Sequence, residues 1–346
     1  MINNSIYIDQ QEYHQYSKQL ILDNIGIQGQ YRLKQSKILI IGAGGLGSPI
    51  IIYLAASGIG NIGIIDHDNI NISNLNRQII YNFNQIKSFK TYYAKQKIKH
   101  INPRCSTHVY TYKLTDQNAI NIIKYYDIII DATDNFNTRY IIDKICYKLH
   151  KIHIYGAINK YEGQVSVFNY KNNIRYSDLY PKKLNLLNNN CNNTGIIGVM
   201  SGMIGILQAT EAIKIVLGIG NIINGKVLIY NCLNNSFKKI TVYPQKKLIT
   251  QGKYNNITRY IQKHELTKYD DLIIIDVKSD KEFSNIHINQ AINIPLKLFQ
   301  HKKTIQFINK QLKYKQIILH CNQLSRATTA SYILLKYKIN THILIN

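Results

Sequence analysis

Four closely spaced glycines form the most informative chemical motif of the chain: Gly42, Gly44, Gly45 and Gly47. They follow an apolar stretch and precede a helical pattern, so backbone N–H groups and the helix N-terminus could together stabilise a phosphate. Asp66 closes the next apolar stretch, 19 residues after Gly47, where a carboxylate can bind ribose hydroxyls. The turn alone is typical of NAD, FAD and ATP sites alike, so other residues must identify the nucleotide.

The residues that follow Asp66 favour a nucleoside triphosphate. The candidates are Ser73, Asn74, Leu75, Asn76, Arg77 and, further along, Lys90. A triphosphate needs several donors and a guanidinium, whereas a dehydrogenase has no evident need for Asn and Arg at this point. Only seven of the 43 basic residues are Arg, which indicates that a guanidinium is required at Arg77. An NAD-dependent dehydrogenase and a regulatory protein without chemistry are the alternatives from other classes.

A carboxylate for a metal ion lies in the segment from Asp131 to Asn135, just past another apolar strand pattern. The carboxyl ends of parallel strands are where ligands bind in doubly wound sheets. Asp134 could hold Mg²⁺, which bridges phosphates through one or two carboxylates. The alternative is that Asp134 or Asn135 only caps the next helix.

A second candidate site lies near the C-terminus, where Cys321 follows a strand pattern and precedes a helical one. Arg326 comes five residues after this cysteine. Loop N–H groups, the helix dipole and the guanidinium would all stabilise a thiolate or a persulfide anion.

Alternating strand and helix patterns must position these residues. In the first part of the chain they predict parallel βαβ units, that is, a Rossmann-like, doubly wound α/β sheet. The predicted strands are 37–41, 61–66, 126–131 and 152–156, with 165–170 as an antiparallel extension; the predicted helices are 49–57, 90–100, 138–150 and a buried one at 198–217. Residues 172–194, rich in Asn and Lys, predict a long loop.

The chain length and a second run of patterns predict two domains. The first covers residues 1–245, a linker covers 246–256, and a small α/β domain covers 257–346. The second domain begins with strands at 272–277 and 316–320.

The first domain resembles the ubiquitin-activating-enzyme-like adenylyltransferases in their bacterial form, the molybdopterin-synthase adenylyltransferases and their thiamine-pathway relatives. The resemblance is carried by 16–19, 42–48, 66–78, Lys90, 131–135, 161–164 and 198–214. It implies ATP-dependent adenylation of the C-terminal glycine carboxylate of a ubiquitin-like sulfur carrier that ends in Gly-Gly. The implied carrier is the small subunit of molybdopterin synthase, and the thiamine thiazole carrier is the alternative.

The same resemblance implies roles for single residues. Gly45 and Asp66 would contact the nucleotide, the polar residues from Ser73 to Arg77 and Lys90 would bind ribose and phosphates, and Asp134 would position Mg²⁺ with Asn135 nearby. Lys18 stands where the family usually carries an Arg that reaches into the partner subunit, so a homodimer is implied. A lysine keeps the charge of that Arg but not its planar fork.

The second domain resembles a rhodanese, through the segments 272–295 and 318–327. This implies that Cys321 accepts sulfur from a persulfide donor, with Arg326 in the active-site loop. Leu324 departs from the family, which often has Gly there. A decayed domain used only for docking is the alternative.

The cysteines show two further points about the first domain. Many family members bind a structural zinc through two C-x-x-C pairs, which would fall near 175–179 and 245–252; neither stretch holds a cysteine, so we expect no zinc. Cys191 lies in the loop where the family often places a cysteine, and it is either a thioester or acyl-disulfide nucleophile or a spare thiol.

The net charge of +24 would by itself suggest a nucleic-acid partner. However, the Lys residues are dispersed along the chain, and Ile, Asn, Lys and Tyr, all encoded by AT-rich codons, make up nearly half of it. We therefore predict codon bias of a small genome rather than a nucleic-acid partner, and place the protein in the plastid stroma, or alternatively the cytoplasm. The lack of an apolar run of roughly 18 residues argues against a membrane span.

Overall fold

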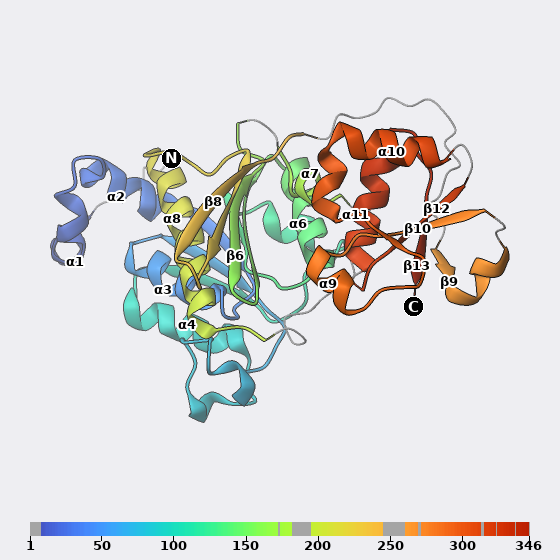
Figure 1. Ribbon diagram of the computed structural model, residues 1–346. Helices are drawn as coiled ribbons and strands as arrows, with labels where there is room; N and C mark the ends of the chain where they lie inside the picture. The colour runs from blue at the N-terminus through green and yellow to red at the C-terminus, as the bar shows by residue number, and fades with distance from the viewer. Residues whose placement is uncertain are drawn as a thin grey trace. The chain divides into compact units, whose positions relative to one another are not determined.

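Two compact units, each with its own sheet and core, make up the chain in the computed structural model (Figure 1). The structure describes residues 8–171, 174–181, 195–244, 260–268, 271–312, 315–322, 324–335 and 337–345. The predicted linker at 246–256 and the domain boundary at 245 lie outside these residues, so the boundaries remain predictions.

The first unit contains an eight-stranded sheet in the order β3-β2-β1-β4-β5-β6-β7-β8. Strands β1 to β5 pair in parallel, and β6 to β8 extend the sheet in antiparallel pairs. The strands are β1 (Lys37–Ile41), β2 (Asn61–Ile65), β3 (Ser106–Tyr110), β4 (Ile128–Asp131), β5 (Ile152–Asn159), β6 (Glu162–Phe168), β7 (Lys226–Asn231) and β8 (Ser236–Thr241). The predicted doubly wound sheet with an antiparallel extension is confirmed.

Helices cover both faces of this sheet. On one face the core joins strand residues such as Ile38 and Ile40 to α3 (Gly47–Ala56), α4 (Lys90–Ile101) and α8 (Gly198–Leu217). On the other face, Leu39 and Ile41 pack with α5 (Ala119–Ile123) and α6 (Phe136–Lys148). Successive strand side chains point to opposite faces, so a continuous apolar strand such as β1 serves both cores at once. The remaining helical segments are α1 (Gln10–Leu20), α2 (Gly26–Gln35), η1 (Ile72–Asn74), η2 (Phe83–Gln85) and α7 (Tyr176–Leu179).

The second unit is a five-stranded parallel sheet in the order β11-β10-β12-β13-β9. Its strands are β9 (Tyr260–Gln262), β10 (Leu272–Asp276), β11 (Ile292–Asn293), β12 (Gln316–His320) and β13 (His342–Ile345). Its helical segments are η5 (Lys263–Lys268), α9 (Asp280–Asn285), η6 (Leu296–Gln300), α10 (Lys302–Leu312) and α11 (Leu324–Leu335). Alternate residues of β10 and β12 again pack into two different apolar clusters. This small α/β unit matches the predicted class.

The loop predicted at 172–194 is only partly a loop. Among its described residues, Tyr176 to Leu179 form the short helix α7, and the Tyr176 side chain is fully buried. Because most residues of the segment are polar, the sequence did not indicate that Tyr176 would be buried. Cys191 lies outside the described residues.

Helix α8 is, among the described helices, the one long and apolar enough to span a membrane by length and composition. Within the unit, however, it packs against α3, β5 and β6. These contacts identify one side of α8 as part of the core. The other side exposes Val199, Met203 and Ile206, so the prediction of a buried helix is confirmed only in part.

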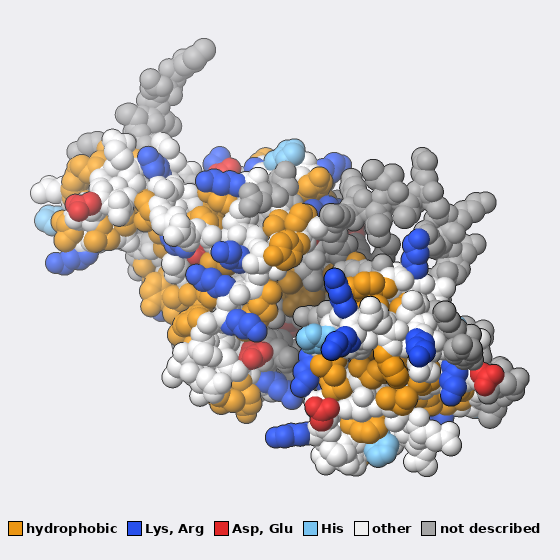
Figure 2. Space-filling model, turned by 45° about the horizontal axis from the view of Figure 1, so that its top comes forward, with side chains coloured by type: hydrophobic (Ala, Val, Ile, Leu, Met, Phe, Trp, Pro, Cys, Tyr) orange, Lys and Arg blue, Asp and Glu red, His pale blue; other side chains and the backbone are white. Residues whose placement is uncertain are grey.

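Basic side chains are spread over the face shown in Figure 2, between hydrophobic and uncharged ones. They do not gather into one stripe there, which agrees with the dispersed lysines of the sequence. A nucleic-acid footprint would instead concentrate cations on one face or along one helix.

Candidate functional site

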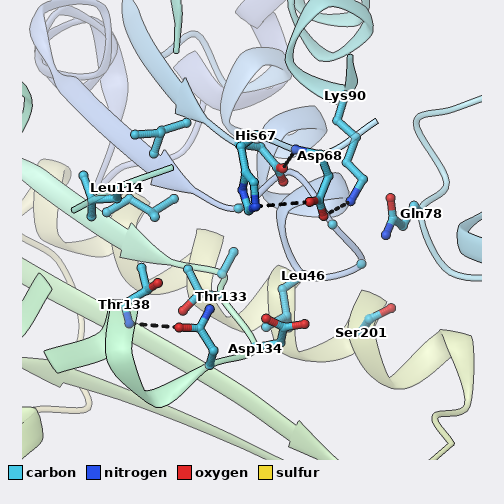
Figure 3. A pocket seen from close by; sticks show the side chains of 18 of the residues that line it. Leu46, His67, Asp68, Gln78, Lys90, Leu114, Thr133, Asp134, Thr138 and Ser201 are labelled. Atoms are coloured by element: carbon cyan, nitrogen blue, oxygen red, sulfur yellow. Dashed lines mark hydrogen bonds and ion pairs between the residues drawn. The ribbon is translucent and has the colours of Figure 1, made fainter. Parts of the chain in front are cut away.

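A cavity of about 270 Å³ opens at the carboxyl ends of the parallel strands of the first unit (Figure 3). Strands β1 and β4 are neighbours in the sheet, and Ile41 pairs with Asp131 at their ends. The chain reverses its strand order between these two strands, and such a switch point is where open α/β sheets bind ligands. Of the predicted site residues, the lining includes Gly42, Gly44, Gly45, Asp66, Asn74, Arg77, Lys90, Asp134 and Asn135.

The glycines divide into those that shape the turn and one that leaves room for a ligand. Gly42 has a φ of +100°, and a Cβ there would lie 2.7 Å from the carbonyl oxygen of Ala132. A Cβ on Gly47 would collide with the carbonyl oxygen of Gly42. At Gly44 the nearest atom is Gln78 Nε2 at 3.6 Å. The backbone at Gly44 is therefore open to the cavity, where a phosphate could approach it.

Asp66 is fixed against the glycine turn. Its Oδ2 accepts a hydrogen bond from the backbone N–H of Ala43 at 2.7 Å, and its Oδ1 accepts one from the N–H of Asp68 at 2.8 Å. Burial raises the pKa of this carboxyl, and the nearby Lys90 opposes the shift. The side chain is 8% exposed and lines the cavity, so it offers a rigid acceptor of the kind that a ribose hydroxyl requires.

Lys90, the first residue of α4, brings a cation to the same wall. It is only 4% exposed, and its Nζ lies 2.8 Å from Asp68 Oδ2. Asp68 also faces His67 Nε2 at 3.5 Å, and Figure 3 shows the three side chains side by side. Asp68, which the sequence analysis did not select, holds the ammonium in place.

Arg77 is oriented by the residues just before it. Its Nη1 donates to the carbonyl oxygen of Ser73 at 2.9 Å and to Asn76 Oδ1 at 3.0 Å. Ser73 and Asn76 are not among the lining residues of the cavity, and neither are Leu75 and Gly47. Ser73 and Asn76 thus position the guanidinium from outside the cavity wall.

Asp134 and Asn135 do different things although they are adjacent. Asn135 Oδ1 accepts a hydrogen bond from the N–H of Thr138 at 2.9 Å and caps helix α6. This agrees with the alternative prediction that one of the two residues caps the next helix. Asp134 is exposed to the cavity, and its carboxylate has no hydrogen bond or ion pair with any residue that the structure describes. In Figure 3 it lies across the cavity from Asp68 and Lys90. A carboxylate left open beside a phosphate-binding turn suits Mg²⁺.

Arg139 and Gln78 are two of the lining residues that sequence reasoning missed. Arg139 is 7% exposed, its Nη2 donates to the carbonyl oxygen of Thr133 at 2.6 Å, and its guanidinium lies over the Tyr155 ring. The scarcity of Arg, which singled out Arg77, applied equally to Arg139 and could have found it. Gln78 Oε1 is buried without a hydrogen-bond partner among the described residues, and no local pattern marked it.

The second candidate site lies in the second unit, where β12 leads directly into Cys321. This thiol is 6% exposed and is not in a disulfide. Arg326 is in the first turn of α11, and its Nη1 and Nη2 donate to Oε2 and Oε1 of Glu282 at 2.7 and 2.8 Å. Sequence analysis found the cysteine and the arginine but not the carboxylate that binds the arginine.

A buried ionic cluster supports the strand ends beside Cys321. Asp276 and Lys278 are both 0% exposed, and Asp276 Oδ2 lies 3.2 Å from Lys278 Nζ and 3.2 Å from His320 Nδ1. Burial opposes ionisation of Asp276, but hydrogen bonds from His320 and Lys278 hold the pKa of its carboxyl below its usual value. The cluster joins the ends of β10 and β12.

Two predicted features of the first unit lie away from the cavity. Lys18 is exposed in the last turn of α1 and does not line the cavity of its own chain. At the first expected zinc position, Arg175 Nη2 donates to Asp143 Oδ2 at 2.7 Å, and the N–H of Tyr176 donates to Asp143 Oδ1 at 3.0 Å. The second expected position, 245–252, lies outside the described residues.

The chain is similar in sequence to named adenylyltransferases and similar in fold to a solved structure. It is 47% identical over 343 residues to a "Probable molybdopterin-synthase adenylyltransferase" of the red alga Gracilaria tenuistipitata var. liui, covering 97% of this chain and 96% of that protein. It is 33% identical to "Adenylyltransferase and sulfurtransferase MOCS3" of Drosophila yakuba, covering 89% of this chain and 75% of that protein. The crystal structure of E. coli MccB with ATP shares the fold, with a TM-score of 0.58 at 21% identity over 66% of this chain and 72% of that one.

Family models match both units. The model of the rhodanese-like domain matches residues 260–346. The model of the ThiF family matches residues 16–250, more than half of the chain. The chain therefore belongs to the ThiF family and carries a C-terminal rhodanese-like domain.

Proposed function

We propose that the first unit uses ATP to adenylate the C-terminal glycine carboxylate of a ubiquitin-like sulfur carrier, the small subunit of molybdopterin synthase. The observation that carries this proposal is the cavity at the switch point, where the glycine turn, Asp66, two cations and the open carboxylate of Asp134 converge. The relatives' names support the activity and favour molybdopterin synthase over the thiamine thiazole carrier. The ThiF family also favours an adenylyltransferase over a dehydrogenase.

The reaction needs positioning and charge stabilisation more than a base, because the attacking carboxylate is already ionised. The carrier carboxylate attacks the α-phosphorus of ATP, forming an acyl-adenylate while pyrophosphate leaves. Asp66 holds the ribose and the turn at Gly44 receives the phosphates. Arg77 and Lys90 neutralise the charge that develops on them.

Asp134 is the residue that would hold Mg²⁺, which neutralises phosphate charge when bound. The support is its open carboxylate inside the cavity, since Asn135 already caps the helix. Gln78 offers one unpaired acceptor to the same cavity.

The second unit is proposed to supply the sulfur. Cys321 takes the outer sulfur of a persulfide donor, and the donor leaves as a thiolate. The Cys321 persulfide then attacks the acyl-adenylate, so that a carbon–sulfur bond forms while AMP leaves. The cysteine at the end of β12 and the sulfurtransferase names among the relatives support this step.

Three further properties complete the proposal. No zinc is expected, and Arg175, which binds Asp143, stands at the first position where the zinc-binding cysteines of the family would fall. A homodimer is supported by Val199, Met203 and Ile206, which recur along one stripe of α8 and are 76%, 37% and 38% exposed. The red-algal relative and the AT-rich composition support the plastid stroma, with the cytoplasm as the alternative.

Exchange of labelled pyrophosphate into ATP tests the adenylation directly. We expect exchange only when a Gly-Gly-ended carrier is added, with the molybdopterin synthase subunit preferred over the thiazole carrier. Cys321→Ala should leave exchange unchanged and abolish sulfur transfer to the carrier. No exchange with any such carrier would contradict the proposed function.

A further inference from the structure

The guanidinium of Arg326 is already bound by a carboxylate of its own chain. Its two terminal nitrogens each donate to one oxygen of Glu282, at 2.7 and 2.8 Å. This two-pronged geometry is the strongest arrangement that an arginine and a carboxylate can form. The third nitrogen of the guanidinium, Arg326 Nε, is buried and has no partner among the described residues.

Glu282 is held in this position from the other side. Its Oε2 accepts hydrogen bonds from the backbone N–H and the Oγ of Ser279, at 2.9 and 2.7 Å. The bond from the Ser279 N–H, together with the bond from the Glu282 N–H to Ser279 Oγ, forms the capping box that begins α9. The carboxylate is therefore placed by its own helix as well as by Arg326, and the pair is fixed at both ends.

Cys321 follows β12 directly, and Arg326 lies five residues later in the first turn of α11, so the ion pair belongs to the same strand–loop–helix segment as the thiol. Hydrogen bonds from Arg326 and Ser279 hold the pKa of the Glu282 carboxyl well below its usual range, so Glu282 is charged at neutral pH. The pKa of Arg326 is raised chiefly by Glu282, and the nearby charge of Cys321 also raises it. The positive charge that should serve a sulfur anion is thus largely balanced by Glu282.

We propose that Glu282 determines which sulfur donor Cys321 accepts, because it balances the charge of Arg326 and so disfavours thiosulfate, a dianion, relative to persulfides. The inference rests on the sulfurtransferase role proposed for Cys321. With thiosulfate, the Cys321 thiolate attacks the outer sulfur; a new sulfur–sulfur bond forms, and sulfite leaves with the electrons of the old one. An alkyl persulfide reacts by the same displacement and releases a thiolate, but it brings at most one negative charge.

The difference between the donors follows from the charge that must be stabilised beside the thiolate. A dianion next to a balanced ion pair gains little attraction, and the carboxylate of Glu282 repels it. Removing that negative charge frees both terminal nitrogens of Arg326 for thiosulfate oxygens. A persulfide gains much less from the same change.

The test compares the full-length chain with its Glu282→Gln variant. Thiosulfate is one donor, with cyanide as the acceptor, and the other is the persulfide of N-acetylcysteine methyl ester, which is otherwise uncharged. We expect the KM for thiosulfate to fall about ten-fold or more in the variant, while the KM for the persulfide changes by less than about two-fold. Glu282→Ala should shift selectivity in the same direction. Glu282→Asp, which keeps the carboxylate, should stay close to the wild type.

Failure of the inference differs from failure of the sulfurtransferase role. If the unaltered chain loads sulfur but Glu282→Gln changes both donors equally or neither, the role of Glu282 is wrong. If the unaltered chain takes sulfur from no donor while pyrophosphate exchange persists, the sulfurtransferase role itself is wrong. Glu282 is 44% exposed, so the variants should fold, and pyrophosphate exchange checks that the rest of the chain is intact.

Discussion

Two adjacent side chains, Asp134 and Asn135, have different roles: Asn135 stabilises a helix, and Asp134 is available to bind a ligand. The side-chain oxygen of Asn135 accepts a hydrogen bond from the first turn of α6, whereas the carboxylate of Asp134 is open to the cavity. Substituting Asn135 should therefore affect the stability of the fold, whereas substituting Asp134 should affect ligand binding.

Asp134→Ala should lower carrier-dependent pyrophosphate exchange by about a hundred-fold or more, since it removes the proposed Mg²⁺ ligand. Its thermal unfolding should stay close to that of the wild type, because the side chain binds no described residue. Asn135→Ala is the matched control and should lose about 1 kcal/mol of stability with its cap. A stable Asp134→Ala variant with full exchange would contradict the assignment.

The sequence predicted the residues of this site that follow a strand or a glycine turn, since those positions are set by local order along the chain. Gly44, Asp66 and Asp134 are of this kind, and all three line the cavity. Arg139 and Gln78 reach it through tertiary packing instead, which no spacing in the sequence reveals. Ser73 does not line the cavity, and its backbone carbonyl orients Arg77, so the role of its side chain stays a prediction.

At the scale of elements, long apolar patterns were predicted well and short polar elements were not. The predicted helix at 198–217 coincides with α8, and the strand at 316–320 coincides with β12. Strand β8, in contrast, is exposed at every residue and has no apolar run to mark it. Helix α7 is only four residues long, so its place depends on the contacts of Arg175 and Tyr176 rather than on a pattern.

The α7 region gives a test of the expected absence of zinc. Asp143 is 5% exposed and binds both Arg175 and the backbone of Tyr176. Asp143→Ala should therefore destabilise the fold by roughly 2 kcal/mol, because it removes a buried acceptor from the Tyr176 N–H and from the half-buried Arg175.

A chelator, in contrast, should leave the thermal unfolding midpoint unchanged. Asp116→Ala is the control, since it breaks the exposed pair with Lys144 and should cost less than about 1 kcal/mol. A midpoint that falls with chelator and recovers with added zinc would show that the prediction of no zinc is wrong.

On the scale of the whole molecule, the positions of the basic side chains say more about function than the net charge of +24 does. Basic side chains are dispersed on the face seen in Figure 2, whereas Arg77, Lys90 and Arg139 converge on one cavity. The total charge reflects composition, and the chemistry depends on a few cations held by the fold. Lys18 is exposed in its own chain, which leaves it available to a second copy.

A mixture of two impaired variants tests whether the molecule is a homodimer with shared sites. Lys18→Ala should weaken exchange by losing a contact made across the dimer, and Asp134→Ala should abolish exchange within its own chain. In a mixed dimer, the Lys18→Ala chain keeps Asp134 and receives Lys18 from its partner, so one of its two sites is complete. Co-refolded equal amounts should then regain about a quarter of the wild-type exchange, because half of the dimers are mixed. Activity equal to the average of the two separate variants would show instead that Lys18 serves its own chain or that no shared site forms.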